Sequence, residues 1–270
     1  PIKSSAASDV YKRQLLMKDS IPDDCDLLLM DGPTNDLSDD EVSLLSGYLG
    51  EGGKVMCLLG DTGLDSLPKL AGLLKDYGIE GADGYIADPQ RCYQNQPYYI
   101  FPVLNLSGDM ADGISSQMVL LMNSRGLTTT DPARDTITTS AFMTTSEQAY
   151  AVTEEDQKQG TYDLGVVATE TISSDSTESK ESRLTVISAG SLIDQQITDA
   201  FSQLENTQVF MNAVTANFDG VTNLSIEAKS LTTEYNTVQH AGGFSILVVF
   251  GIPAVVLIGG FVVWFRRRKA

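Results

Sequence analysis

Short apolar runs alternate with amphipathic stretches along the first 80 residues of the chain. Residues 26–30 (DLLLM) form an apolar run that ends at Gly32-Pro33, which is typical of a buried strand followed by a turn. Residues 54–59 (KVMCLL) repeat this pattern, whereas residues 42–49 and 66–77 carry apolar side chains at helical spacing. The order strand, helix, strand, helix with short connections predicts an α/β protein built on a parallel sheet.

The first predicted helix has a clear start. Ser38 and Glu41 have the spacing of a capping box, in which each side chain accepts a hydrogen bond from the other residue's backbone amide. Acidic residues favour the first turn of a helix because of its dipole. A cation site is the alternative for the acids of this region, but no EF-hand spacing occurs, and we favour the helix start. These acids are Asp31, Asp36, Asp39, Asp40 and Asp61.

The middle of the chain has a weaker pattern. Residues 173–182 (SSDSTESKES) are polar and predict a mobile loop between paired strands. Residues 192–218 form a predicted helical region after a glycine-serine turn, and residues 156–159 a predicted turn. Further strands are predicted at 98–104, 117–123, 136–145, 162–171, 183–189 and 224–228.

The C-terminus predicts a membrane anchor. Phe244 to Phe265 contains no charged residue, and about 20 apolar residues in a helix match the thickness of a bilayer. Pro253 near its middle is tolerated in such helices, and Trp264 lies near its end. The cluster Arg266, Arg267, Arg268 and Lys269 predicts a cytoplasmic tail, because basic flanks stay on that side.

Five segments follow from these patterns. Residues 1–14 have no hydrophobic period and resemble a translated sequencing adapter, so we expect a C-terminal fragment of a longer protein. The others are an extracytoplasmic α/β domain at 15–228, a juxtamembrane stretch at 229–243, the membrane helix at 244–265 and the basic tail at 266–270.

The net charge of the chain limits the classes of partner that it can bind. The formal net charge is −18, from 36 acidic and 18 basic residues. Four of the bases follow the predicted membrane helix, so the preceding part carries 14 bases against 36 acids. Such a surface repels nucleic acid, and we expect no nucleic-acid partner. A basic partner or cations would suit it, but we favour a surface that keeps the domain soluble.

The ends of the predicted strands are the candidate ligand site. Parallel sheets bind ligands beyond the carboxyl ends of their strands, where a flavin or dinucleotide is one alternative. Turn residues chosen for backbone geometry are the favoured alternative, because the chain lacks a glycine fingerprint and acidic residues crowd two of the turns. The chain also has no P-loop motif for ATP. We therefore predict no cofactor and no metal. The residues concerned are Asp31, Gly32, Pro33, Gly60, Asp61, Gly190 and Ser191.

The chain offers little for nucleophilic catalysis. Cys57 lies within a predicted buried strand, and Ser191 follows Gly190 without completing G-x-S-x-G. The single histidine, His240, precedes the membrane helix. We therefore predict that the protein is not an enzyme. Three cysteines without a C-x-x-C pair (Cys25 and Cys92 are the others) also indicate neither a disulfide framework nor a zinc site.

An aromatic cluster gives a second binding hypothesis. Tyr93, Tyr98, Tyr99 and Phe101 could line a surface for a sugar or a peptide, although aromatic side chains in such a region more often serve packing. This cluster motivates the alternative that the chain is a stand-alone surface-anchored carbohydrate- or peptide-binding protein.

In this order, the landmarks resemble the gliding-motility-type auxiliary proteins of ABC transporters, a family of uncharacterised ABC transport auxiliary components. The resemblance implies a fold like glutamine-amidotransferase or flavodoxin domains, and a non-catalytic accessory role beside an ABC permease and its separate ATPase subunit. It also implies the plasma membrane of a bacterium as the location. The substrate is not implied. The landmarks are 26–33 (DLLLMDGP), 37–41 (LSDDE), 48–55 (YLGEGGKV), 77–79 (YGI), 183–191, 209–214 (VFMNAV), 226–231 (IEAKSL) and 264–268 (WFRRR).

Overall fold

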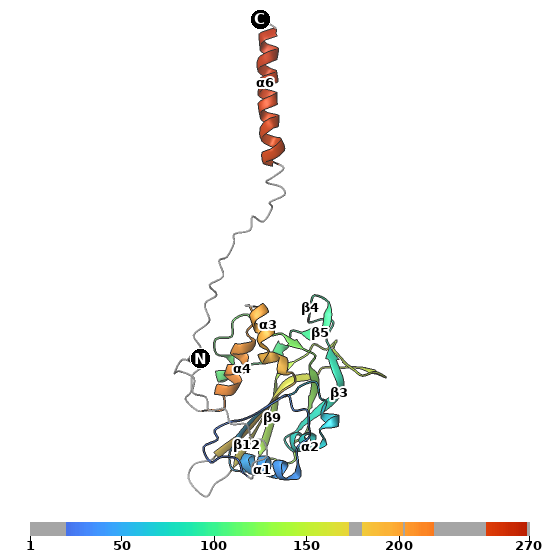
Figure 1. Cartoon of the computed structure of the whole chain (residues 1–270), viewed down its shortest axis with the longest axis vertical. Helices are drawn as coiled ribbons and strands as arrows, with labels where there is room; N and C mark the ends of the chain where they lie inside the picture. Colours follow the sequence, from blue (N-terminus) through green and yellow to red (C-terminus); the bar gives the residue numbers. More distant parts are fainter. Residues whose placement is uncertain (1–19, 173–179, 202, 219–246, 269–270) are drawn as a thin grey trace, which may run out of the picture. The chain divides into compact units, whose positions relative to one another are not determined.

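A computed structural model describes residues 20–172, 180–201, 203–218 and 247–268 (Figure 1). The chain divides into two units, residues 1–226 and 227–270, which are described separately below. Several predicted features lie outside the described residues. These are residues 1–14, the strand at 224–228, the juxtamembrane stretch with His240, and Phe244 and Lys269, together with most of the polar loop at 173–182.

Three parallel strands form one side of the main sheet. Strand β1 (Leu28–Asp31) pairs with β2 (Lys54–Leu58), and β2 pairs with β13 (Lys180–Ile187) on its other side. Helix α1 (Asp39–Gly50) connects β1 to β2, and α2 (Pro68–Asp76) follows β2. The predicted βαβ unit is therefore confirmed.

The rest of this sheet is antiparallel, so the prediction of a parallel sheet holds only for its first three strands. The strand order is β1-β2-β13-β12-β8-β3-β10-β11, with β9 paired to β12 and β6 paired to β9. Strand β13 follows β12 as an antiparallel neighbour, and it joins β2 because both strands are buried on both faces. The antiparallel strands are β3 (Ile79–Ala87), β6 (Val103–Leu104), β8 (Arg125–Thr129), β9 (Ile137–Thr144), β10 (Tyr150–Val152), β11 (Gln157–Gln159) and β12 (Asp163–Ile172).

A small second sheet and several short helices complete the first unit. Strands β4 (Cys92–Tyr93), β5 (Gln96–Ile100) and β7 (Leu121–Met122) form an antiparallel sheet in the order β4-β5-β7. The predicted helical region after β13 is broken into three pieces. They are the 3₁₀ turn η3 (Gly190–Ile193), α3 (Gln195–Ala200) and α4 (Asn206–Thr215). Two further 3₁₀ turns are η1 (Leu64–Ser66) and η2 (Gly108–Ala111).

Two hydrophobic cores lie on opposite faces of the main sheet. Alternate residues of β2 point to different cores, Val55 and Cys57 to one and Met56 and Leu58 to the other. The first core includes leucines of α1 and α2, and the second includes residues of α4, η2 and η3. In Figure 1 the strands correspondingly separate α1 and α2 from α3 and α4. Helices on both faces explain why the parallel strands are apolar throughout.

Three differences from the sequence pattern have physical causes. Strand β3 lies in a stretch predicted to be irregular, because Gly81, Asp83 and Gly84 hide its alternation. The predicted turn at 156–159 contains the short strand β11, which is fully exposed. Strand β13 begins at Lys180, inside the stretch predicted as a loop, because pairing with β12 continues to Ile172.

The second unit contains an apolar helix. A π-helical turn, Leu247–Gly251, leads into α6 (Ile252–Arg268). Pro253 is the second residue of α6, next to the boundary with this π-helical turn. Residues 249–268 are long and apolar enough to cross a membrane, and an 18-residue window within them has a mean hydropathy of 2.0.

Candidate functional site

The structure brings together the predicted strand-end turns. The amide of Gly32 donates to Leu58 (2.9 Å), and the amide of Gly190 donates to the carbonyl of Leu59 (2.7 Å). A Cβ added at Gly60 would lie 3.1 Å from the Cα of Gly32, so glycine allows this close approach of two backbones. Asp31 also lies here, because a Cβ added at Gly190 would be 3.6 Å from its Oδ1.

The polar groups of these turns are engaged in holding the fold. Ser191 Oγ accepts a hydrogen bond from the Met122 amide (2.8 Å) and donates to the Met122 carbonyl (3.1 Å). The Asp61 carbonyl accepts hydrogen bonds from the Arg125 guanidinium and from the Tyr85 hydroxyl (3.4 Å). The guanidinium of Arg125 lies 3.8 Å from the centre of the Tyr85 ring. These contacts favour turns chosen for backbone geometry over a ligand site.

Cys57 is placed as expected for a core residue. Its side chain is fully buried in β2, and burial, together with the charge of Asp31, raises the pKa of its thiol to about 12. The thiol is therefore protonated at neutral pH, which makes it a weak nucleophile.

The acids near α1 serve helix starts. Ser38 and Glu41 form the predicted capping box, with Oγ of Ser38 3.2 Å from the Glu41 amide. Asp36 accepts hydrogen bonds from the amides of Lys69 and Leu70 (3.0 and 3.1 Å) at the start of α2. Asp39 forms an ion pair with Lys69. Among the described residues, no group of three histidine, cysteine or acidic side chains is arranged to hold a metal ion.

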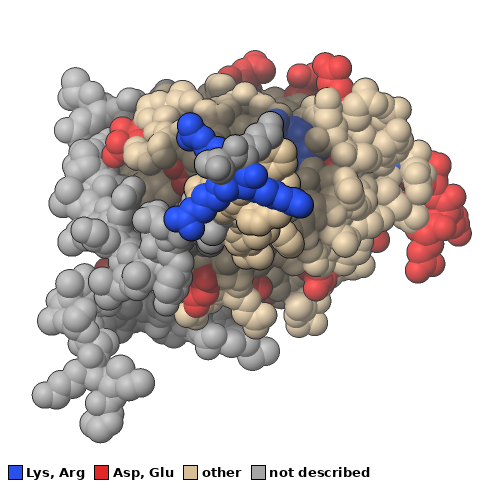
Figure 2. Space-filling model, turned by 90° about the horizontal axis from the view of Figure 1, so that it is seen from above, with Lys and Arg blue, Asp and Glu red and all other residues tan. Residues whose placement is uncertain are grey.

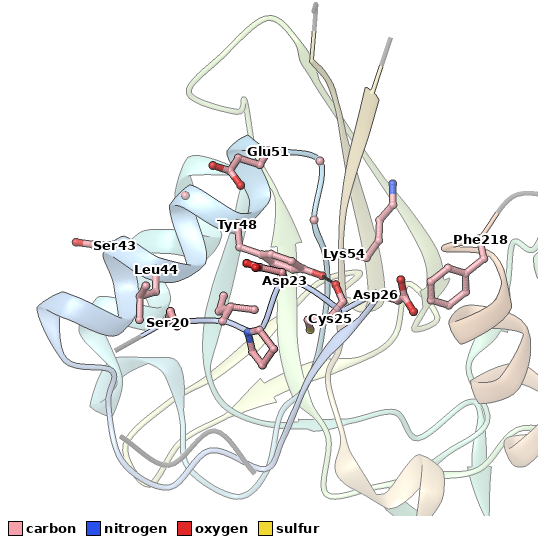
Figure 3. Close-up of a pocket in the computed structure, with 15 residues that line it drawn as sticks. Ser20, Asp23, Cys25, Asp26, Ser43, Leu44, Tyr48, Glu51, Lys54 and Phe218 are labelled. Carbon is pink, nitrogen blue, oxygen red and sulfur yellow. Dashed lines mark hydrogen bonds between the residues drawn. The ribbon is translucent and has the colours of Figure 1, made fainter. Parts of the chain in front are cut away.

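Figure 3 shows a groove of about 650 Å³ between α1 and the segment that leads into β1. Tyr48 points from α1 into this groove, and its hydroxyl donates to the carbonyl of Cys25 (3.0 Å). Burial raises the pKa of Tyr48 to about 12. Ser20 and Phe218 also line the groove, and the described part of the first unit begins and ends at these two residues.

The second cleft lies beside the predicted aromatic cluster. We call it the hairpin cleft; it has a volume of about 410 Å³. Residues 90–92 and Phe101 form one wall, and Ser116, Gln117 and Met118 form the other. The Tyr93 ring makes edge-to-face contacts with Phe101 and Phe201, with ring centroids 6.3 and 5.3 Å apart. The aromatic cluster thus serves packing in part, and it also supports a cleft wall.

The first wall of the hairpin cleft is fixed by Arg91. Its guanidinium donates to the carbonyls of Phe101 (2.7 Å) and Pro102 (3.2 Å). The buried carboxylate of Asp88 accepts hydrogen bonds from the amides of Gln90 and Arg91 (both 3.0 Å) and from Ser146. This wall is held without any help from a ligand.

The second wall is fixed by Glu205, at the start of α4. Its carboxylate accepts hydrogen bonds from the amides of Ser115, Ser116 and Gln117, at 2.8 to 3.1 Å. Burial raises the pKa of Glu205, but these hydrogen bonds outweigh burial and lower the pKa to about 2. Neighbouring Asn206 makes two hydrogen bonds with the backbone of Leu120.

The sequence pattern did not indicate the hairpin cleft. Gln90, Ser116 and Gln117 carry no recognisable motif, and Glu205 is not a usual helix cap. The aromatic residues were the single feature that pointed to this region. Of them, Phe101 lines the cleft, whereas Tyr98 is exposed outside it.

On the face seen in Figure 2, acidic side chains are spread in separate groups. This distribution fits the interpretation that the acids keep the domain soluble.

Comparison with known proteins bears on the fold of the chain. No protein-family model matches the sequence, and no curated protein matches it. A solved structure described as "mmIFT52 N-terminal domain" is similar, with a TM-score of 0.52 and 16% sequence identity. The alignment covers 74% of this chain and 79% of that chain. At this identity the similarity shows a shared mixed α/β fold and nothing about activity.

Proposed function

We propose that the chain is a membrane-anchored, non-catalytic accessory subunit of an ABC-type export system. In this proposal the α/β domain lies outside the cytoplasm, where it binds or guides substrate or couples the permease to the envelope. The permease and a separate ATPase are its partners. The bacterial plasma membrane is its location, and a flavodoxin-like or glutamine-amidotransferase-like fold of the domain is part of the same proposal.

The apolar C-terminal helix supports the membrane anchor of this proposal, and the order of the sequence landmarks motivates the transporter role. The exposed side chains of α6 are apolar until Arg266, Arg267 and Arg268 in its last turn. An isolated helix with apolar side chains on all its faces is stable in lipid and not in water. A basic end supports a cytoplasmic tail and hence an extracytoplasmic α/β domain.

The orientation is testable with the chain's own cysteines. Cys92 is half-buried in the α/β domain, whereas Cys57 is fully buried. In a Cys25→Ser background, a membrane-impermeant maleimide should label Cys92 on intact cells, and Cys92→Ser should abolish this labelling. An Ala270→Cys variant of the doubly substituted chain should be labelled only after permeabilisation. The reverse pattern would place the domain in the cytoplasm and overturn the proposed topology.

The partnership is tested by purification. The full chain, extracted from native membranes in mild detergent, should copurify with a multi-span permease and a P-loop ATPase. Helix substitutions such as Ile258→Lys should reduce both membrane integration and copurification, because a charge near the centre of a membrane helix costs about 3 kcal/mol. Ile258→Leu is the matched control. Purification of the intact chain without any transporter subunit would contradict the accessory role.

The hairpin cleft favours a second candidate, a surface-anchored carbohydrate- or peptide-binding protein that works without a transporter. Ligand binding that persists when the transporter genes are deleted would support this alternative.

A further inference from the structure

We propose that the hairpin cleft binds a neutral oligosaccharide, with a sugar ring on Phe101 and hydroxyl groups on the side-chain amides of Gln90 and Gln117. This binding site would be where the domain holds substrate, so the inference rests on the substrate-binding part of the proposed function.

The chemistry of the cleft walls matches such a ligand. A sugar presents C–H groups on its ring faces and hydroxyl groups around its edge. Phe101 and Met118 provide apolar surface. The side-chain amides of Gln90 and Gln117 and the hydroxyl of Ser116 provide both hydrogen-bond donors and acceptors. Among the residues that the structure describes, no acidic side chain lines the cleft surface, although the chain has a net charge of −18; the Glu205 carboxylate lies behind the second wall.

Hydrogen bonds hold the backbone of both cleft walls before any ligand arrives. The hydrogen bonds of Arg91 fix one wall, and the three amides bound by Glu205 fix the other. Gln117 has a φ of 55°, a conformation that non-glycine residues seldom adopt, and its side chain is exposed at the cleft. A rigid site loses little conformational entropy on binding, so even a shallow cleft can bind a flexible oligosaccharide.

Two other ligand classes fit less well. An extended peptide usually binds by adding to a free strand edge, and β4, the edge beside the cleft, is two residues long. An anion would need a cation directed at it, but Arg91, the charged residue of the cleft, donates to two backbone carbonyls.

Binding is measured with the full chain in a zwitterionic detergent, because detergents with sugar headgroups would compete. The probes are cello-, malto-, xylo- and chito-hexaose, with an uncharged hexapeptide and inorganic phosphate as separate arms. Ligand-observed NMR titration detects affinities in the millimolar range. At least one hexasaccharide should bind saturably, and neither the peptide nor phosphate should.

Two variants test the site itself. Gln117→Gly removes the side-chain amide, and glycine readily adopts the backbone φ of 55° at this position. Phe101→Leu keeps an apolar side chain but loses the flat aromatic ring. Each should weaken binding roughly 3- to 10-fold, as expected for one hydrogen bond or one ring contact. Gln96→Ala and Tyr98→Ala, on the same hairpin but outside the cleft, should leave binding unchanged.

Three results would overturn the proposal. They are no binding of any hexasaccharide, binding that is unaffected by both Gln117→Gly and Phe101→Leu, and binding of the peptide or phosphate in place of sugar. Copurification with transporter subunits does not depend on these variants, so failure of this inference is distinguishable from failure of the accessory role.

Discussion

Both carboxylate oxygens of Glu205 accept hydrogen bonds from the backbone amide of Ser116, at 3.0 and 3.1 Å. The two residues are 89 positions apart in the chain, and their contact joins the start of α4 to the loop before β7. The loop amides point inward at a negative charge, as they would at a bound anion. The carboxylate of the chain itself therefore organises one wall of the hairpin cleft.

Glu205 should make the stability of the first unit depend on acid pH. Its pKa is about 2 in the folded chain, against 4.5 for the ordinary side chain, so its contribution is complete above pH 4.5 and is lost as the pH falls toward 2. Glu205→Gln should destabilise the fold by about 2 kcal/mol at pH 7. Denaturant titrations at pH 7 and pH 3 measure this difference, which should be smaller at pH 3.

The control is Glu154→Gln, at an exposed turn. It should change stability little at either pH. Equal effects of the two substitutions at pH 7 would show that the hydrogen bonds of Glu205 add no stability beyond that of an exposed glutamate.

The ion pair of Arg134 and Glu170 should matter more than other ion pairs at the surface. Glu170 is buried, and its carboxylate accepts hydrogen bonds from Arg134 (2.7 and 2.9 Å), Tyr77 (3.2 Å) and Thr136 (3.1 Å). Arg134→Met leaves this buried charge without its main partner and should cost about 2 kcal/mol of unfolding free energy. Lys75→Met, which breaks the exposed pair of Lys75 with Glu80, is the control and should change stability little. A similar effect of both substitutions would contradict the role of burial.

Two glycines should respond to alanine in opposite directions. Gly84 has a φ of 77°, and an added Cβ would lie 2.0 Å from the carbonyl oxygen of Val152. Gly84→Ala should therefore cost at least about 2 kcal/mol. Gly72 lies within α2 with nothing within 4 Å of an added Cβ, so Gly72→Ala should stabilise by about 0.5–1 kcal/mol. Melting temperatures of the two variants test the signs, and a stabilising Gly84→Ala would rule out the close contact of β3 with β10.

The three cysteines should differ in reactivity. Cys57 is fully buried and has a pKa of about 12, whereas Cys25 and Cys92 are half-buried. A maleimide at pH 7 should label Cys25 and Cys92 in the folded chain and Cys57 only with denaturant. Mass spectrometry of labelled peptides identifies each site, and fast labelling of Cys57 without denaturant would show that β2 is not closed.

Predictions from local sequence succeeded where neighbouring residues decide the outcome. The capping box of Ser38 and Glu41 depends on residues three apart, and the burial of Cys57 follows from an apolar strand. The ends of β1 and β2 also meet as predicted, because a βαβ unit places the carboxyl ends of its two strands at one edge of the sheet.

Predictions failed where partners lie far apart in the chain. Gly81 and Gly84 conceal β3, since its strand form depends on pairing with β8 and β10. The prediction of a wholly parallel sheet failed for the same reason, because no local pattern shows that β13 lies between β2 and β12.

The sequence by itself determined the α/β class, the start of α1, the buried cysteine of β2 and the apolar C-terminal helix, because periodicity and caps act over a few residues. Tertiary structure alone decided the sheet order and the hairpin cleft. The cleft exists because Arg91 binds carbonyls ten and eleven residues away and Glu205 binds amides about ninety residues away. Such contacts form only after the chain has brought distant segments together, and individually polar residues such as Gln117 give no sign of them in advance.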